Sequence, residues 1–79
     1  MSPTVFRHGG YRFFFFSNEE PRMHVHVASA EGEAKFWLEP IISLARYNDL
    51  SPRRLREMQK IVEERENEIR LAWKKYFKS

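Results

Sequence analysis

The sequence contains no cysteine, only three glycines and four prolines, and no long apolar run. Without cysteine, neither a disulfide framework nor a thiolate metal site can stabilise the chain. The longest apolar run, Phe13 to Phe16, is far shorter than the roughly 20 residues that span a bilayer. No charged and apolar leader is recognisable either. These absences predict a soluble, cytoplasmic protein that contacts no membrane.

The chain is instead rich in aromatic residues and in charges of both signs. Of its 79 residues, 42% are hydrophobic and 15% aromatic, which suffices for one small domain and argues against disorder. Residues 1–50 carry five Lys or Arg against six Asp or Glu, whereas residues 51–79 carry nine against five. The net charge of +3 therefore originates in the second part. This basic segment favours either a solvated surface or contact with a phosphate-bearing or acidic partner.

Aromatic and β-branched residues indicate strands in the first half. Residues 4–8 and 11–17 flank Gly9-Gly10, and residues 24–28 and 33–38 flank Glu31-Gly32, two patterns typical of hairpins. After Pro40, residues 41–45 fit either an edge strand or a helical turn. We take them as a fifth strand.

A helix is predicted from Pro52 onward. Ser51 can cap the free amides, and proline suits the first helical position. Apolar residues then recur at helical spacing, without Gly or Pro, as far as Phe77. The predicted fold is α+β: an antiparallel sheet of four to five strands in two hairpins, over about residues 3–45, packed against a long helix over 52–77. All 79 residues form one domain.

Such a helix would be about 39 Å long, more than short strands can cover. Polar residues 65–68 interrupt its apolar stripe, so the helix either bends there around its own core or leaves its last turns to a partner. In the second case, Ile69, Trp73 and Phe77 form a partner-binding surface. A homodimer is one such assembly.

The second hairpin places reactive side chains on one face. A two-residue Glu31-Gly32 loop sets His26 opposite Trp37 and His24 opposite Glu39, because directly opposed residues share a face. The same register sets Ala28 opposite Lys35. One face then carries His24, His26, Lys35, Trp37 and Glu39.

These side chains suit metal-independent RNA cleavage. Histidine is suited to proton transfer because the pKa of a free imidazole lies near neutrality, so His24 and His26 are the candidate proton-transfer groups. Lys35 can stabilise charge on phosphorus. Glu39 joins this catalytic set through the predicted register, and Trp37 can stack on a base. No cofactor is required.

Two other interpretations stay open for the same residues. His-x-His on a strand aims two imidazoles the same way, and Glu39 could complete a three-ligand metal site. Alternatively, the histidines are structural, Trp37 covers a gap, and Glu39 pairs with a neighbouring cation.

The first predicted hairpin also contains a feature that could indicate a bound phosphate. A two-residue Gly9-Gly10 turn sets Arg7 opposite Arg12, and like charges directly across a ladder are unfavourable. A different register, a bulge, a neighbouring acidic side chain or a bound phosphate could relieve this pair. With Arg22 and Trp37, the two arginines are candidate nucleic-acid contacts. Phe13 to Phe16 are expected to form core.

The motifs PTVFR at residues 3–7, YRFFFFSN at 11–18, HVHV at 24–27 and GEAKFWL at 32–38 resemble a small bacterial family, domain of unknown function 4160. The likeness extends to Trp73 and Phe77. The chain departs from it at Pro21-Arg22-Met23, where the family often has consecutive prolines. The resemblance implies a small sheet-plus-helix protein, often encoded beside another small protein in what looks like a toxin-antitoxin pair. It also implies function at His24, His26, Lys35 and Trp37.

Two hypotheses follow for the function. The first is a bacterial toxin-like component that cleaves RNA without metal and is neutralised by a cognate antitoxin, the product of a neighbouring gene. The alternative is a non-enzymatic module that binds nucleic acid or a protein partner, as a regulator or an antitoxin. A zinc- or nickel-dependent protein is a third, weaker interpretation.

Overall fold

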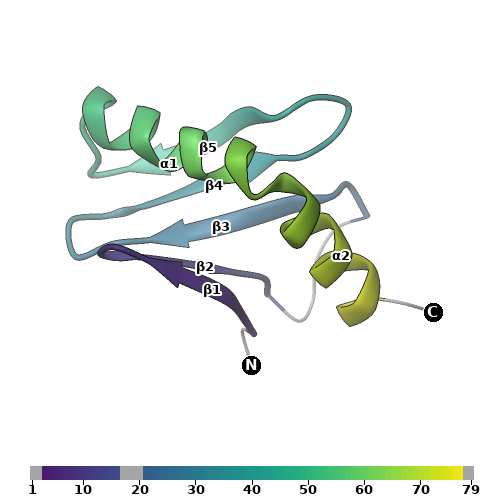
Figure 1. Ribbon diagram of the computed structural model, residues 1–79. Coiled ribbons are helices and arrows are strands. Elements are labelled where there is room, and N and C mark those ends of the chain that lie inside the picture. The colour runs from purple at the N-terminus through teal and green to yellow at the C-terminus, as the bar shows by residue number, and fades with distance from the viewer. Residues whose placement is uncertain (1–2, 17–20, 78–79) are drawn as a thin grey trace.

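In the computed structural model, which describes residues 3–16 and 21–77, one antiparallel sheet carries two helices on one face (Figure 1). The strands are β1 (Thr4–His8), β2 (Tyr11–Phe14), β3 (His24–Ala28), β4 (Glu33–Trp37) and β5 (Ser43–Asn48). Their spatial order is the same as their order in the chain. The helices are α1 (Pro52–Glu64) and α2 (Glu66–Tyr76). The predicted α+β class and the five-stranded antiparallel sheet are confirmed.

The fifth strand lies slightly later than predicted, at residues 43–48 rather than 41–45. Trp37 pairs with Ser43, so residues 38–42 are used to reverse the chain direction. This connection contains the cis peptide bond Glu39–Pro40. The second strand is shorter than expected: it ends at Phe14, and residue 17, where we predicted its end, lies outside the described residues.

The single long helix that we predicted is wrong, because the helix breaks at Arg65. Its start is as expected, since the Ser51 hydroxyl accepts a hydrogen bond from the Arg54 amide at 3.2 Å. At the break, Arg65 has φ −115° and ψ 26°, and its guanidinium lies 3.6 Å from the centre of the Phe6 ring. One straight helix would outrun the short strands. The break lets the apolar side of α2 stay on the sheet.

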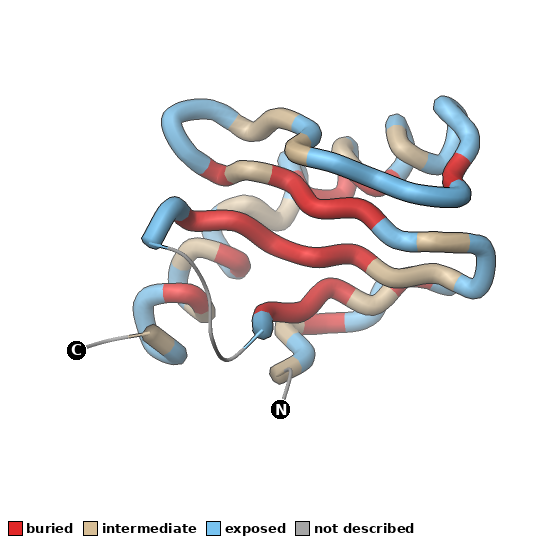
Figure 2. The backbone as a smooth tube through the Cα atoms, turned by 180° about the vertical axis from the view of Figure 1, so that it is seen from behind, coloured by how far each residue is buried: buried red, intermediate tan, exposed pale blue. Residues whose placement is uncertain are grey.

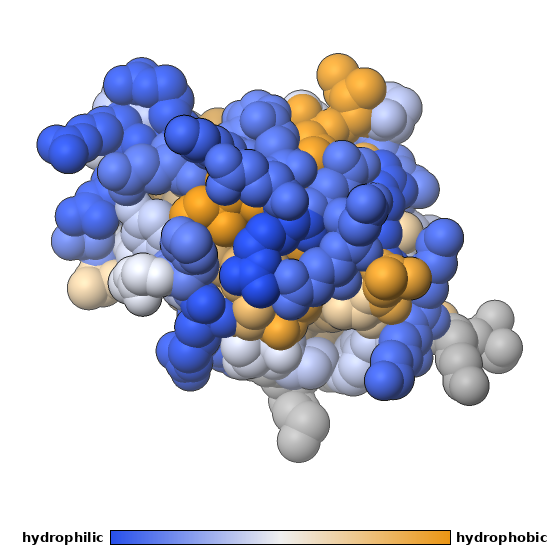
Figure 3. Space-filling model, in the orientation of Figure 1, coloured by the Kyte–Doolittle hydropathy of each residue, from blue (hydrophilic) through white to orange (hydrophobic). Residues whose placement is uncertain are grey.

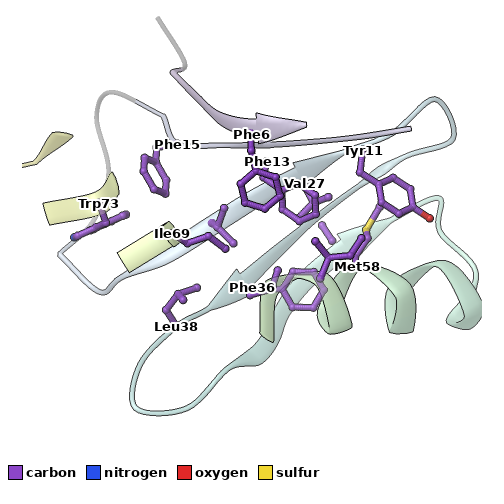
Figure 4. Close-up of a cluster of buried hydrophobic side chains, with 14 of the residues drawn as sticks. Phe6, Tyr11, Phe13, Phe15, Val27, Phe36, Leu38, Met58, Ile69 and Trp73 are labelled. Atoms are coloured by element: carbon purple, nitrogen blue, oxygen red, sulfur yellow. The ribbon is translucent and has the colours of Figure 1, made fainter. Parts of the chain in front are cut away.

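The core fills the space between the helices and one face of the sheet (Figure 4). Phe13 and Phe36 are fully buried beneath Met58 and Ile69. At the β1 edge of the core, the rings of Phe6 and Phe13 stack with centroids 4.5 Å apart. Burial of this aromatic and aliphatic surface is the main force that holds α1 and α2 to the sheet.

The two outer surfaces of the molecule differ. The helix side is largely hydrophilic, with apolar atoms visible between the charged side chains (Figure 3). Neither of the two described helices lies over the other sheet face, yet the middle of its strands is buried (Figure 2). We call this second surface the helix-free face. Along each strand, the side chains on this face alternate with the side chains that point into the core.

Gly32 provides a test of the packing at the β3–β4 connection. A Cβ atom at Gly32 would overlap the Asn48 carbonyl oxygen and lie 2.7 Å from the Asp49 carbonyl oxygen. Because backbone atoms cannot rotate away, we expect Gly32→Ala to lower the free energy of unfolding by about 1–3 kcal/mol. Urea denaturation measures the change.

Gly10→Ala is the matched control, since a Cβ there meets nothing within 4 Å. We expect it to leave the stability within about 0.5 kcal/mol of wild type. Equal losses in the two variants would contradict this account of Gly32.

Candidate functional site

The register arranges the helix-free face in three rows that run across the strands. The first row is Arg7, Arg12, Ala28, Glu33 and Asn48, the second is Thr4, Phe14, His26, Lys35 and Arg46, and the third is His24, Trp37 and Ser43. The predicted face of His24, His26, Lys35 and Trp37 is therefore present. Neighbouring strands lie about 4.8 Å apart, so a row from β1 to β5 spans about 19 Å.

The predicted pairing within the β3–β4 hairpin is shifted by two residues. His24 pairs with Trp37 and His26 with Lys35, because residues 29–32 connect the strands instead of Glu31-Gly32 alone. The Ser29 amide donates to the Gly32 carbonyl at 2.9 Å. A shift of two preserves the face of each residue, since the side chains of a strand alternate with period two.

The shift removes Glu39 from the predicted catalytic group. Glu39 follows the end of β4 and does not pair with His24. Its carboxylate lies 3.5 Å from the Arg70 Nη1 on α2. Glu39 therefore connects the β4–β5 turn to the helix layer.

Both histidines are buried, although the sequence indicated an accessible face. His24 is 0% exposed and His26 is 6% exposed. The His26 ring stacks on Phe14 at 5.4 Å and meets Phe16 edge-on at 4.5 Å. The His24 ring contacts Trp37 at 5.6 Å and, at the end of the sheet, Trp73 of α2 at 5.2 Å. Aromatic neighbours from both layers thus enclose the imidazoles.

A backbone hydrogen bond determines the tautomer of His24. Its Nδ1 lies 2.6 Å from the Arg22 carbonyl oxygen, which can only accept, so Nδ1 carries the proton. This bond orients His24 and holds the segment that leads into β3. The geometry gives His24 a positioning role, whereas His26 lies directly opposite Lys35, which is itself 8% exposed.

Trp37 is in contact with two cations. The guanidinium of Arg22 lies 4.0 Å from the centre of the ring, and the Lys35 ammonium lies 4.4 Å from it. Arg22 is held in place by donating from Nε to the Glu39 carbonyl at 2.8 Å. The indole is therefore part of a cation–π group rather than an unoccupied stacking platform.

Like charges face each other twice on this surface. The predicted Arg7–Arg12 pair is present, and Lys35 pairs with Arg46 in the same way. In each pair one side chain leans over a ring two residues along its own strand: Arg12 over Phe14 at 4.4 Å, and Lys35 over Trp37. Arg12 also donates from Nε to the Thr4 hydroxyl at 2.8 Å. The other two members, Arg7 and Arg46, are exposed.

A hollow of about 330 Å³ opens beside the second of these pairs. Its lining includes Phe16, His26, Glu33, Lys35, Arg46 and Asn48. Phe16 is 44% exposed, so the fourth phenylalanine of the run lies at the surface and not in the core as predicted. The hollow combines a ring, two cations and a carboxylate.

The residues predicted to bind a partner belong to the protein's own core. Ile69 is fully buried, Trp73 is nearly so, and Phe77 packs against the cluster. The Trp73 ring meets Phe15 edge-on at 5.3 Å. The exposed apolar side chains of α2 are instead Leu71 and Tyr76.

Sequence reasoning missed a polar cluster on the helix side. The Tyr11 hydroxyl donates to Glu57 Oε1 at 2.5 Å and accepts from Arg54 Nη1 at 3.2 Å. Arg54 also contacts Glu31 at 3.5 Å. No local signal predicts this cluster, because Tyr11 and Glu57 are 46 residues apart in the chain.

The cluster borders a second cavity, of about 410 Å³, next to the Gly9-Gly10 turn. Burial and the hydrogen bond to Glu57 raise the pKa of Tyr11. The hydrogen bond from Tyr11 lowers the pKa of Glu57. Since the network joins β2, α1 and the β3–β4 turn, its first role is to fix α1 on the sheet.

The metal interpretation is not supported by the geometry. Within residues 3–16 and 21–77, no group of three His, Asp or Glu side chains is placed to hold a metal ion. Glu39, the proposed third ligand, lies with Arg70. The same residues contain no helix long and apolar enough to cross a membrane.

A family model described as "Domain of unknown function (DUF4160)" matches residues 10–74. The chain belongs to this family. The match includes β2 to β5, α1 and most of α2, and with them His24, His26, Lys35 and Trp37. No curated protein and no solved structure matches the chain. Membership of DUF4160 carries no assigned reaction, so the function has to be argued from the helix-free face.

The Tyr11–Glu57 bond predicts an effect of pH on stability. A carboxylate with a lowered pKa stabilises the fold above its unfolded pKa, and this stabilisation is lost as the pH falls through the folded pKa. We therefore expect the free energy of unfolding to fall below about pH 4.5 more steeply in wild type than in Glu57→Gln. Urea denaturation at a series of pH values measures both slopes.

Glu64→Gln, which removes an exposed carboxylate from the same helix, is the control and should retain the wild-type slope. Identical slopes in wild type and Glu57→Gln would contradict the proposed role of Glu57.

Proposed function

We propose that this DUF4160 protein binds single-stranded RNA on its helix-free face. The observation that carries the proposal is the pair of like-charged cross-strand contacts, Arg7–Arg12 and Lys35–Arg46. Directly opposed like charges repel each other, and one member of each pair, Arg7 and Arg46, is exposed to solvent. A phosphate at each pair would turn this repulsion into binding energy.

The distribution of charge supports a chain-like anion rather than a single small one. All five cations of residues 1–50 belong to this face: Arg7, Arg12, Arg22, Lys35 and Arg46. They extend from β1 to β5, about 19 Å by strand spacing. Among the described residues in the three rows, Glu33 is the acidic one. A nucleic-acid backbone has charges repeated over such a length.

The rings on the face favour a single strand. Phe16 is 44% exposed, and Arg7 and Arg46 are exposed on the same face. Unpaired bases can stack on aromatic and guanidinium planes, whereas a duplex hides its base faces. A sheet surface with both cations and rings therefore suits single-stranded RNA.

Removal of the two exposed arginines tests this proposal. We expect Arg7→Ala/Arg46→Ala to weaken binding of a labelled single-stranded RNA and to lower the slope of log Kobs against log salt by about 1.4, since each lost phosphate contact contributes about 0.7. Fluorescence anisotropy at several salt concentrations measures the affinity and the slope.

The matched control is Arg53→Ala/Arg56→Ala, which removes the same charge from exposed positions of α1. It should change the slope little. If both double variants lose the same affinity, binding depends on overall charge and the helix-free face is not the site.

We propose RNA cleavage by a toxin-like protein as a second candidate function, because His26 and Lys35 are directly opposed and both line the hollow. In this mechanism His26 accepts the proton of a 2′-hydroxyl, and the 2′-oxygen attacks phosphorus. The bond to the 5′-oxygen breaks, that oxygen takes a proton from water, and Lys35 stabilises the charge on the phosphoryl oxygens. The step needs no metal.

Cleavage in the presence of a chelator tests this candidate. We expect His26→Gln, which retains a planar polar side chain, to slow RNA cleavage by about 10²–10⁴-fold, since it cannot act as a base. His8→Ala, at an exposed position of β1, should cleave at the wild-type rate. Gel analysis of purified RNA gives the rates, and circular dichroism confirms that the variants are folded.

The toxin role has a separate test in bacterial growth. Arrest on induced expression of wild type but not of His26→Gln, at equal soluble levels, supports a toxin that an antitoxin neutralises. Arrest by neither, together with intact RNA binding, leaves the protein as an RNA-binding regulator.

A further inference from the structure

The hollow between β4 and β5 contains two adjacent cross-strand pairs of different character. Glu33 pairs with Asn48, and Lys35 pairs with Arg46. All four residues line the hollow. Successive pairs on one face are about 7 Å apart along a strand. The hollow therefore has a cationic end and a hydrogen-bonding end, with the Phe16 ring at its border.

We infer that this hollow binds one nucleotide of the RNA strand, with its phosphate at Lys35 and Arg46 and a guanine base at Glu33. This inference rests on the proposed function and names the base that the face recognises. The hollow, at about 330 Å³, lies in the range of small-ligand sites. Phe16, which is 44% exposed, supplies a ring against which the base can stack.

The chemistry of Glu33 selects guanine. An ionised carboxylate only accepts hydrogen bonds, so the base edge must donate. Guanine offers two adjacent N–H donors on its Watson–Crick edge, from N1 and from the N2 amino group, and these match the two carboxylate oxygens. Adenine, cytosine and uracil each place an acceptor beside their donor, which repels one of those oxygens.

Asn48 is less suited to reading the base. Its Nδ2 lies 3.4 Å from Asp49 Oδ2, and this contact engages the amide. Glu33, in contrast, forms no ion pair with any other residue that the structure describes. The discrimination between bases therefore depends on Glu33, and the phosphate pair supplies affinity without base preference.

Two titrations test the inference. The first compares guanosine and adenosine 5′-monophosphates by NMR, and follows the amide signals of residues 33–35 and 46–48. The second compares an oligouridylate that carries one central guanine with the same strand carrying adenine, cytosine or uracil there. We expect guanosine monophosphate to shift these signals at about tenfold lower concentration than adenosine monophosphate, and the guanine strand to bind about tenfold more tightly than the other three.

Glu33→Gln is the decisive variant, because Glu33 is exposed and the change keeps the size of the side chain but replaces one accepting oxygen with an NH2 donor. It should abolish the guanine preference and leave the affinity for oligouridylate close to wild type. Glu64→Gln, which removes an exposed carboxylate from α1, should retain the preference.

The outcomes separate the two proposals. RNA binding that depends on Arg7 and Arg46 but is equal for all four strands, with no shift by guanosine monophosphate, overturns the guanine site and leaves the proposed function standing. A Glu33-dependent shift by guanosine monophosphate without RNA binding overturns the proposed function and retains a mononucleotide site. Absence of both overturns both.

Discussion

The architecture depends on the burial of β3 on both faces. This central strand places Val25 and Val27 in the core beneath the helices, and His24 and His26 among rings on the other side. Each row of the helix-free face that spans the sheet passes through it. Because aromatic neighbours pack against it from both sides, β3 holds β2 and β4 in one register. The positions of the surface cations follow from that register.

The cations of the helix-free face are stabilised by aromatic rings rather than by carboxylates among the described residues. Arg12 lies over Phe14, and Arg22 and Lys35 lie over Trp37. A ring attracts a cation through the negative face of its π-system. On the helix side, in contrast, Arg54, Arg65 and Arg70 pair with glutamates. The two sides of this DUF4160 protein thus use arginine differently.

The fold was largely predictable because its signals are local. Gly9-Gly10 and the alternating HVHV segment indicate strands, and Ser51-Pro52 marks the start of α1. The shared face of His24, His26, Lys35 and Trp37 was also predicted, since it requires only the parity of the strand and tolerates a register shift of two. The cross-strand partners within that face were predicted wrongly, because they depend on the length of the connection at residues 29–32. The sequence showed the break at Arg65 only as a run of polar residues, and it gave no sign of the contact between Arg65 and the Phe6 ring.

Local patterns of residues were enough to predict the class of the fold, the strand faces and the Arg7–Arg12 pair, because periodicity and turn residues act over a few positions. The accessibility of these residues follows instead from how the sheet and the helices pack. In the packed structure both histidines are buried, and Ile69 and Trp73 belong to the core. Glu39 forms an ion pair with Arg70, and Arg46 lies opposite Lys35. Each of these outcomes depends on contacts between segments far apart in the chain. The physical reason is that burial and electrostatic environment are properties of the packed layers, which no local pattern of residues contains.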